Sequence, residues 1–217
     1  MINFDYVKAR DVGDAIKQIG GHPNARFIAG GTNLIDLIKE NVARPTRLID
    51  ITGLPLAEIE ETKSGGLRIG ALVPNSDLAY DERIKTRYPL LSSAILAGAS
   101  AQLRNMASTG GNLLQRTRCL YFYDPAMPCN KREPGTGCGA IDGFNRMNAI
   151  LGWSQSCIAV HPSDMAVAMT ALDAEVEVQS AKARRRIKMA DFHRLPENAP
   201  QKETNLMAGE QIGRAHV

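Results

Sequence analysis

The sequence predicts an α+β fold, in which strand–helix alternation comes first and paired strands follow. Two observations support this prediction. Residues 2–51 alternate short apolar runs with stretches of helical periodicity, as in a small α/β unit. After Pro55, apolar and polar residues alternate on either side of glycine turns, a pattern typical of antiparallel hairpins.

The elements of the first fifty residues each have a local signal. Residues 11–20 carry apolar side chains at helical spacing, with Asp11 as an N-cap and Gly20-Gly21 as a stop. The other predicted elements of this part are strands at 2–4, 25–31 and 47–51, and a helix at 32–42. A break at residues 53–56 is the predicted boundary, with a first subdomain over 1–54 and a second over 55–217.

The second part has longer and more varied signals. Its predicted elements are a hairpin over 56–73, one long and largely buried helix over 89–107, a helix after the N-cap Ser163, and paired strands over 174–180 and 184–192. Arg184, Arg185 and Arg186 are predicted to form a solvated turn between those last two strands.

Composition excludes several classes of function. The 217 residues carry a formal net charge of +3, too small to indicate nucleic acid or an anionic membrane as a partner. No apolar run approaches the ~20 residues that span a bilayer, so no membrane span is expected. The first residues are charged from Asp5 onward and lack the apolar core of a secretory signal. This fits either the cytoplasm or export in the folded state with a signal-bearing partner.

The C-terminal residues IGRAHV, from Ile212 to Val217, end with neither a capping pattern nor an apolar period. The same six letters are one frame of a common sequencing adapter. We therefore expect the natural chain to continue beyond Gln211; a frayed tail is the alternative.

Two glycine turns indicate a phosphate-bearing ligand. The first follows a predicted strand and precedes a predicted helix; it comprises Ile28, Ala29, Gly30, Gly31, Thr32, Asn33 and Leu34. The second, Ser108-Thr109-Gly110-Gly111-Asn112, repeats the combination of hydroxyl, glycine pair and amide. Glycine pairs let backbone N–H groups approach an anion, although either turn alone is also consistent with a plain tight turn. Neither a G-x-G-x-x-G after a strand nor a P-loop motif is present, which favours a non-Rossmann dinucleotide or phosphate site.

The four cysteines gather in one irregular, Pro- and Gly-rich stretch. Cys119, Cys129, Cys138 and Cys157 follow the spacing C-x9-C-x8-C-x18-C. No pair is C-x-x-C, so zinc ribbons and bacterial ferredoxin motifs match poorly. A wide-spaced Cys₄ set suits a [4Fe–4S] cluster, while a zinc site, disulfides in an exported chain, and a core role for Cys157 are the alternatives.

Taken together, three blocks resemble a known family. FIAGGTNLIDLIKENVARPTRLIDI, ASTGGNL and HPSDMAVAMTALDAEVEV are similar to the FAD-binding medium subunit of molybdenum hydroxylases, the family of xanthine dehydrogenase and carbon monoxide dehydrogenase. The resemblance covers nearly the whole chain. It implies a vanillyl-alcohol-oxidase (PCMH)-type fold, in which two α+β subdomains enclose an extended FAD. The family's C-terminal domain is missing from this sequence.

The resemblance also implies roles for residues. Residues 28–34 would surround the FAD diphosphate and ribityl chain, with Ser108, Thr109, Gly111 and Asn112 as the second phosphate wall. Asp164 and Glu210 would lie near the polar edge of the flavin, as would Ile212. No side chain is predicted to be a catalytic acid, base or nucleophile, and His161 is predicted to be structural.

The cysteines lie in an insertion, over about 115–160, that ordinary members of the family lack. RTRCLYFYDPAMPCNKREPGTGCGAIDGFNRMNAILG resembles the insertion in the FAD subunit of bacterial periplasmic aldehyde oxidoreductase, where four cysteines hold one [4Fe–4S] cluster. Such a cluster with four thiolates carries a charge of about −2. Basic residues outnumber acidic ones nearby: Arg116, Arg118, Lys131, Arg132 and Arg146.

The function implied is electron transfer within a molybdenum-dependent aldehyde oxidoreductase. The partners would be a large subunit with the molybdenum cofactor and a small subunit with two [2Fe–2S] clusters, in a heterotrimer, and electrons would leave FAD for an external acceptor. Two rivals differ in kind: the FAD subunit of a xanthine dehydrogenase or aromatic acyl-CoA reductase, and an iron–sulfur interaction module without flavin.

Overall fold

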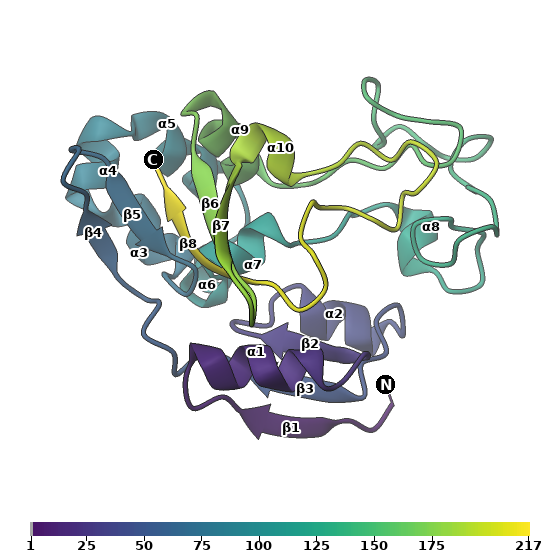
Figure 1. Cartoon of the computed structure of the whole chain (residues 1–217). Helices are drawn as coiled ribbons and strands as arrows, with labels where there is room; N and C mark the ends of the chain where they lie inside the picture. Colours follow the sequence, from purple (N-terminus) through teal and green to yellow (C-terminus); the bar gives the residue numbers. More distant parts are fainter. Residues whose placement is uncertain (1) are drawn as a thin grey trace.

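The first fifty residues form a three-stranded parallel sheet (Figure 1). In this computed structural model, which describes residues 2–217, strand β3 (Arg47–Asp50) lies between β1 (Asp5–Lys8) and β2 (Ala25–Ile28). Helix α1 (Val12–Gly20) packs Ala15 into the core beside Ile49. Helix α2 (Leu34–Lys39) follows the first glycine turn.

Most local predictions for this part are confirmed. Asp11 caps α1 by accepting the N–H of Asp14 at 2.8 Å, and Gly21 ends the helix. The strand predicted at 2–4 is wrong, because β1 forms at Asp5–Lys8 instead. This strand is at a sheet edge and is mostly exposed, so its position is set by parallel pairing with β3 and leaves little apolar pattern.

The second sheet has five antiparallel strands in the order β4-β5-β8-β6-β7. Their bounds are Ile59–Glu61 for β4, Leu67–Gly70 for β5, Glu175–Gln179 for β6, Arg184–Lys188 for β7 and Gln211–His216 for β8. The two predicted strand pairs, β4 with β5 and β6 with β7, are confirmed. Arg184–Arg186 are part of β7, so the predicted arginine turn is wrong; the chain turns at 180–183 instead.

Strand β8 at the centre of this sheet was not predicted. Ile212 and Ala215 are buried, and the strand pairs with β5 on one side and β6 on the other. The last residues therefore form a strand whose buried positions, Ile212 and Ala215, are explained only by its pairing with β5 and β6.

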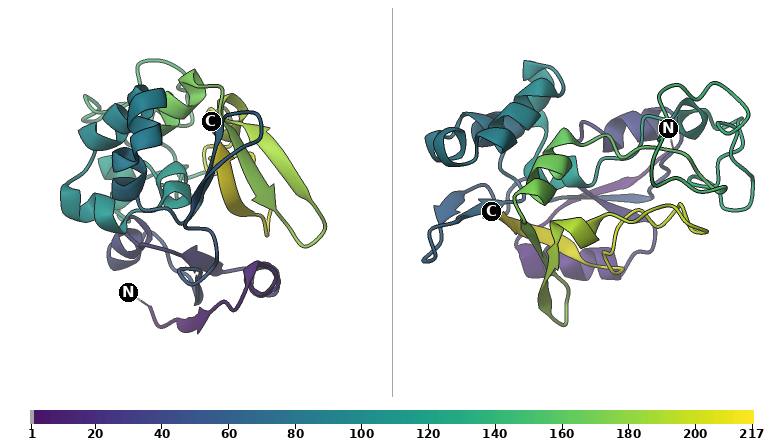
Figure 2. Two further views of the ribbon diagram at one scale, coloured as in Figure 1. Left: turned by 90° about the vertical axis from the view of Figure 1, so that its left-hand side faces the viewer. Right: turned by 90° about the horizontal axis from the view of Figure 1, so that it is seen from above.

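A layer of helices covers one face of the second sheet (Figure 2). It contains α3 (Asn75–Tyr80), α4 (Glu82–Arg87), α5 (Pro89–Ala97), α6 (Ala101–Met106) and α9 (Asp164–Ala171). The prediction of one buried helix over 89–107 is wrong. Ala99 has a φ of +55°, Ser100 caps a new helix through Leu103 at 3.3 Å, and α6 buries no residue.

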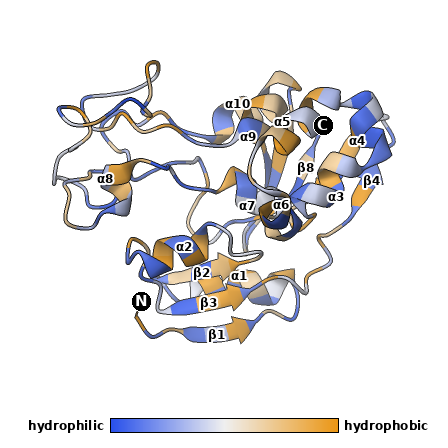
Figure 3. Ribbon diagram, turned by 180° about the vertical axis from the view of Figure 1, so that it is seen from behind, coloured by the Kyte–Doolittle hydropathy of each residue, from blue (hydrophilic) through white to orange (hydrophobic). Residues whose placement is uncertain are grey.

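Residues 115–160 extend away from both sheets, with α8 (Leu120–Tyr123) as their single helix within the described chain (Figure 1). Figure 3 shows apolar positions along this extension, and Met147, Ile150 and Leu151 are exposed there. The remaining short helices are α7 (Thr109–Leu113) and α10 (Met189–Phe192). None of the helices over residues 2–217 combines the length and apolarity that crossing a membrane requires. The boundary at residues 54/55 stays a prediction, and Leu54 and Leu56 pack into the core of the first sheet.

Candidate functional site

The two glycine turns lie against each other. A Cβ atom at Gly30 would stand 1.7 Å from the carbonyl oxygen of Met106, at the end of α6, and 3.4 Å from the nitrogen of Ala107. No side chain fits in that space. The β2–α2 turn and the α6–α7 turn therefore meet through their backbones, which places residues 28–34 beside residues 106–111.

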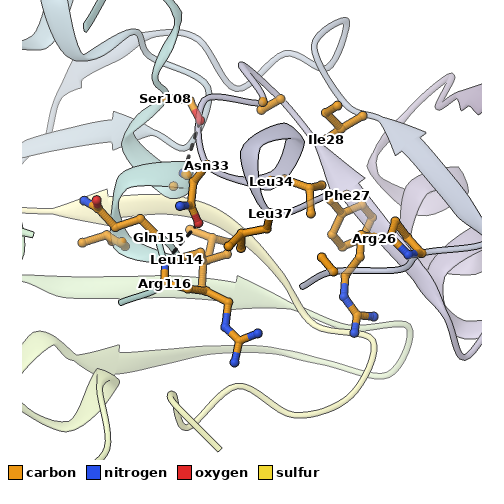
Figure 4. A pocket seen from close by; sticks show the side chains of 18 of the residues that line it. Arg26, Phe27, Ile28, Asn33, Leu34, Leu37, Ser108, Leu114, Gln115 and Arg116 are labelled. Carbon is orange, nitrogen blue, oxygen red and sulfur yellow. Dashed lines mark hydrogen bonds between the residues drawn. The ribbon is translucent and has the colours of Figure 1, made fainter. Parts of the chain in front are cut away.

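A cavity of about 660 Å³ opens where the turns meet, within the range of about 300–1,000 Å³ typical of small-ligand sites. Figure 4 shows its lining from close by. The predicted site residues that line it are Ile28, Ala29, Gly30, Gly31, Thr32, Asn33, Leu34, Ser108, Gly111, Glu210 and Ile212. The cavity thus brings together the whole first turn, part of the second, and Glu210 and Ile212 from the C-terminal region.

Three predicted site residues do not line this cavity. Thr109 is buried and donates its hydroxyl to the carbonyl of Val73 at 3.0 Å. Asn112 accepts the hydroxyl of Ser163 at 2.6 Å, and Asp164 is the exposed first residue of α9. These contacts hold α7 and the start of α9 in position behind the cavity.

Arginine side chains line part of the cavity (Figure 4). Burial and the charge of Arg116 both lower the pKa of Arg26. Like charges that repel across one cavity favour a negatively charged ligand. Arg132 and Arg44 also contribute to the lining. Sequence reasoning had linked Arg116 and Arg132 to the cysteines and had missed Arg26 and Arg44, which have no motif around them.

Two histidines stack at the cavity wall. The ring centroids of His161 and His193 are 3.9 Å apart, and both residues line the cavity. Burial lowers the pKa of His161 to about 3, and it lowers that of His193 as well. His193 Nε2 lies 2.8 Å from the carbonyl of Leu113, while the buried Nε2 of His161 has no hydrogen-bond partner among the described residues. The lowered pKa values favour the neutral form of both rings at pH 7.

Glu210 is held by two charge-assisted hydrogen bonds. Arg185 donates to both carboxylate oxygens at 2.8 Å, and the backbone N–H of Met207 adds a third bond at 2.7 Å. The hydrogen bonds from Arg185 hold the pKa of this carboxyl below its ordinary value of 4.5. The ion pair with Arg185 therefore fixes an acidic group at the wall of the cavity.

Replacing Glu210 with glutamine should flatten the acid limb of the stability–pH curve. Because the folded-state pKa is depressed, the carboxylate stabilises the fold above its ordinary pKa, and that contribution is lost as pH falls through the lowered value. We expect a loss of about 1–3 kcal/mol at pH 7 that shrinks below about pH 4. Urea unfolding from pH 3 to 8 measures it; an equal deficit at every pH would contradict this account.

The four cysteines are all free thiols, so none of the disulfides considered above is present. The backbones of Cys129 and Cys138 pair in an isolated antiparallel bridge, and Cys119 packs against the apolar cluster that contains Cys129. Burial raises the pKa of the Cys157 thiol, and the N–H of Ala159 and the charge of Lys131 oppose this rise. Cys138 and Cys129 lie near enough to act on the same thiol. Helix α8, short bridges and side-chain hydrogen bonds, such as those of Asn130 with Gly135 and Gly137, organise the loops that carry them.

Among residues 2–217, no three Cys, His, Asp or Glu side chains converge closely enough to hold one metal ion. A [4Fe–4S] core binds one thiolate per iron and so keeps its ligands further apart than a single ion does. Four cysteines gathered in one segment fit such a core in number and type. Asn148, whose amide is 3.5 Å from the sulfur of Cys119, shows that donors to sulfur are also at hand.

Comparison with known proteins gives a consistent result. A family model described as "FAD binding domain in molybdopterin dehydrogenase" matches residues 2–211. The aldehyde oxidoreductase FAD-binding subunit PaoB of Escherichia coli K12 is 55% identical over 210 residues, which cover 96% of this chain and 66% of PaoB. The glyceraldehyde dehydrogenase medium chain of Sulfolobus acidocaldarius is 28% identical, over 89% of this chain and 53% of that protein. The chain thus spans about two thirds of the length of PaoB and about half of the length of the Sulfolobus chain.

Solved structures share the fold. Carbon monoxide dehydrogenase of Oligotropha carboxidovorans superimposes with a TM-score of 0.71 at 22% identity, covering 100% of this chain and 60% of that one. Quinoline 2-oxidoreductase of Pseudomonas putida 86 gives a TM-score of 0.70 at 22% identity, covering 100% and 59%. The predicted α+β, PCMH-type fold is confirmed.

Proposed function

Because this chain belongs to the family of FAD-binding domains in molybdopterin dehydrogenases, we propose that it binds FAD in the 660 Å³ cavity. It would do so as the FAD-binding, electron-transfer subunit of a molybdenum-dependent aldehyde oxidoreductase. The observation that carries this proposal is the meeting of the two glycine turns at Gly30, which builds one cavity from both predicted phosphate-binding segments.

Some of these residues would contact FAD, and others would hold them in position. Residues 28–34 with Ser108 and Gly111 offer backbone N–H groups, hydroxyls and an amide to the diphosphate and ribityl chain. Thr109 and Asn112 support them from behind, through the hydrogen bonds of α7 to Val73 and to Ser163 at the start of α9. Asp164, exposed at the start of α9, would lie near the polar edge of the flavin. Bound FAD would let the subunit pass electrons from the [2Fe–2S] clusters of a small subunit to an external acceptor.

A second cofactor is part of the proposal. Cys119, Cys129, Cys138 and Cys157 would hold one [4Fe–4S] cluster, which supplies either one-electron chemistry or a structural cross-link for the insertion. The closeness of Cys129, Cys138 and Cys157 supports it. This cluster distinguishes the proposed subunit from family members that lack the insertion.

The proposed partners are a large subunit with the molybdenum cofactor and a small subunit with two [2Fe–2S] clusters. Exposed apolar side chains on the insertion support a protein partner, since monomeric surfaces rarely gather so many. They are Leu120, Phe144, Met147, Ile150, Leu151 and Trp153.

Replacing both Ile150 and Leu151 with aspartate should weaken assembly of this subunit with its partners at least tenfold. These side chains are 87% and 84% exposed here, and burying each stabilises an interface by about 1.5–3 kcal/mol. Size-exclusion chromatography of co-expressed subunits measures the effect. Val167→Asp, at a 71% exposed site on α9, is the matched control and should assemble normally. Equal assembly of both variants would contradict an interface at the insertion.

The proposal as a whole is tested by anaerobic purification, with iron, sulfide and FAD counted per chain. About four irons and one FAD are expected, from the stoichiometry of a single [4Fe–4S] cluster. FAD without iron would remove the cluster and weaken the aldehyde assignment in favour of the wider family. Iron without FAD, in the presence of partner subunits, would favour an iron–sulfur interaction module instead.

A further inference from the structure

Arg116, Lys131 and Glu203 form an ion-pair cluster, the junction triad, between the cavity and the cysteine-rich segment. We propose that this triad couples the two sites, so that loading the cysteine site with iron and sulfide tightens the binding of FAD in the cavity. The inference rests on the proposed function, because it concerns the same two cofactors.

One carboxylate holds both cations of the triad. Arg116 Nε donates to one oxygen of Glu203 at 2.5 Å, and Lys131 Nζ lies 3.2 Å from the other. The three side chains are 27%, 12% and 26% exposed, so the pairs are far less screened than those on the open surface. Lys131 also donates to the carbonyl of Pro200 at 2.9 Å, which ties the cysteine segment to the chain before β8.

Arg116 contacts both sites directly. Its backbone N–H donates to Asn33 Oδ1 at 3.0 Å, in the first glycine turn (Figure 4). Its guanidinium donates to the carbonyl of Lys131 at 3.4 Å and stacks over the ring of Phe122 at 4.5 Å. Arg116 and Glu203 line the cavity, whereas Lys131 belongs to the cysteine segment alone. A shift of either site must therefore move Arg116 or its partner.

An apolar contact runs parallel to the triad. Phe122 is fully buried and packs with Leu37 of α2 and with Cys129. Leu37 lines the cavity. The helix that follows the first glycine turn thus rests on the same ring that supports a cysteine and carries Arg116.

The insertion depends on these contacts for its order. Its large apolar side chains are mostly exposed, and Phe122 is the one large side chain that it buries fully among the described residues. A segment with so little core keeps conformational freedom unless something cross-links it. A cluster bound by four cysteines would restrict it, holding Lys131 and Arg116 in the arrangement that shapes the cavity. FAD would then bind without the cost of ordering them.

The test is a titration of the flavin-free full chain with FAD, followed by flavin fluorescence, once with the cysteine site reconstituted with iron and sulfide and once iron-free. We expect FAD to bind about tenfold tighter in the reconstituted chain, within the range of about 5–150-fold known for coupled sites. Glu203→Gln and Lys131→Met should each reduce this ratio below about twofold. Glu60→Gln, which removes an ion pair with Arg68 in the β4–β5 hairpin, should leave it unchanged.

The two variants approach the junction triad from opposite sides. Glu203→Gln alters a cavity wall and Lys131→Met does not, so a direct effect on FAD would appear in the first variant alone and would overturn the inference. Equal FAD affinity with and without iron in the unmodified chain would overturn it as well, while leaving both cofactor sites in place. Failure to bind FAD at any iron content would instead overturn the proposed function.

Discussion

Replacing Gly30 with alanine should abolish the retention of FAD and lower the free energy of unfolding by about 3 kcal/mol. The new Cβ would stand 1.7 Å from the carbonyl oxygen of Met106, and neither atom can rotate away, because both are fixed to the backbone. The β2–α2 turn must separate from α6, which opens the cavity where the two glycine segments meet. Flavin content after gel filtration and urea unfolding measure the two effects.

The matched control for this variant is Gly20→Ala. A Cβ at Gly20 would meet no atom within 4 Å, and the residue lies in the last turn of α1. Alanine there should be neutral or stabilise the chain by about 0.5–1 kcal/mol, since it lowers the entropy of the unfolded state. Normal flavin content in Gly30→Ala, equal to that of Gly20→Ala, would show that the close contact of the two turns is not needed for binding.

The fold was predictable where its signals are local. Helix α1 and both hairpin pairs follow from periodicity, caps and turn residues that lie within a few positions of each other. Strand β8 and the edge strand β1 were missed because each is defined by partners far away in the sequence. The helix break at Ala99 depends on a positive φ, which an alanine in the sequence does not predict.

The candidate site was likewise predictable only where its residues are close together in the sequence. A contiguous turn such as residues 28–34 stays together in any fold, so its place on the cavity follows once the turn is recognised. Thr109 has the same hydroxyl as Ser108, but it donates that hydroxyl to Val73, and only the packing of α7 decides which of the two faces the cavity. Arg26, His193 and Glu203 reach the cavity from three separate segments, so no sequence motif includes them.

Replacing Cys129 with serine should reduce the iron content from about four atoms per chain to nearly none. Thiolates bind iron–sulfur cores, whereas a serine hydroxyl remains protonated at neutral pH and is a poor ligand. Cys129 is 7% exposed, and its backbone pairs with that of Cys138. Serine therefore fits the space and leaves the chain's contacts largely intact. Iron and sulfide analysis measures the loss. Asp142→Asn, at an exposed position of the same insertion, should keep its iron; a fully loaded Cys129→Ser variant would exclude Cys129 as a ligand.

The same variant separates two roles for the cluster. The insertion buries little apolar surface of its own and carries the exposed side chains proposed to contact a partner, so losing the cross-link should first disorder that surface. We therefore expect Cys129→Ser to assemble poorly with its partner subunits, while the assembled fraction reduces its flavin at the normal rate. Stopped-flow reduction by aldehyde of the assembled fraction measures this. Slow flavin reduction in a fully assembled, FAD-saturated complex would instead place the cluster on the electron path, because such a complex lacks only the cluster as a carrier.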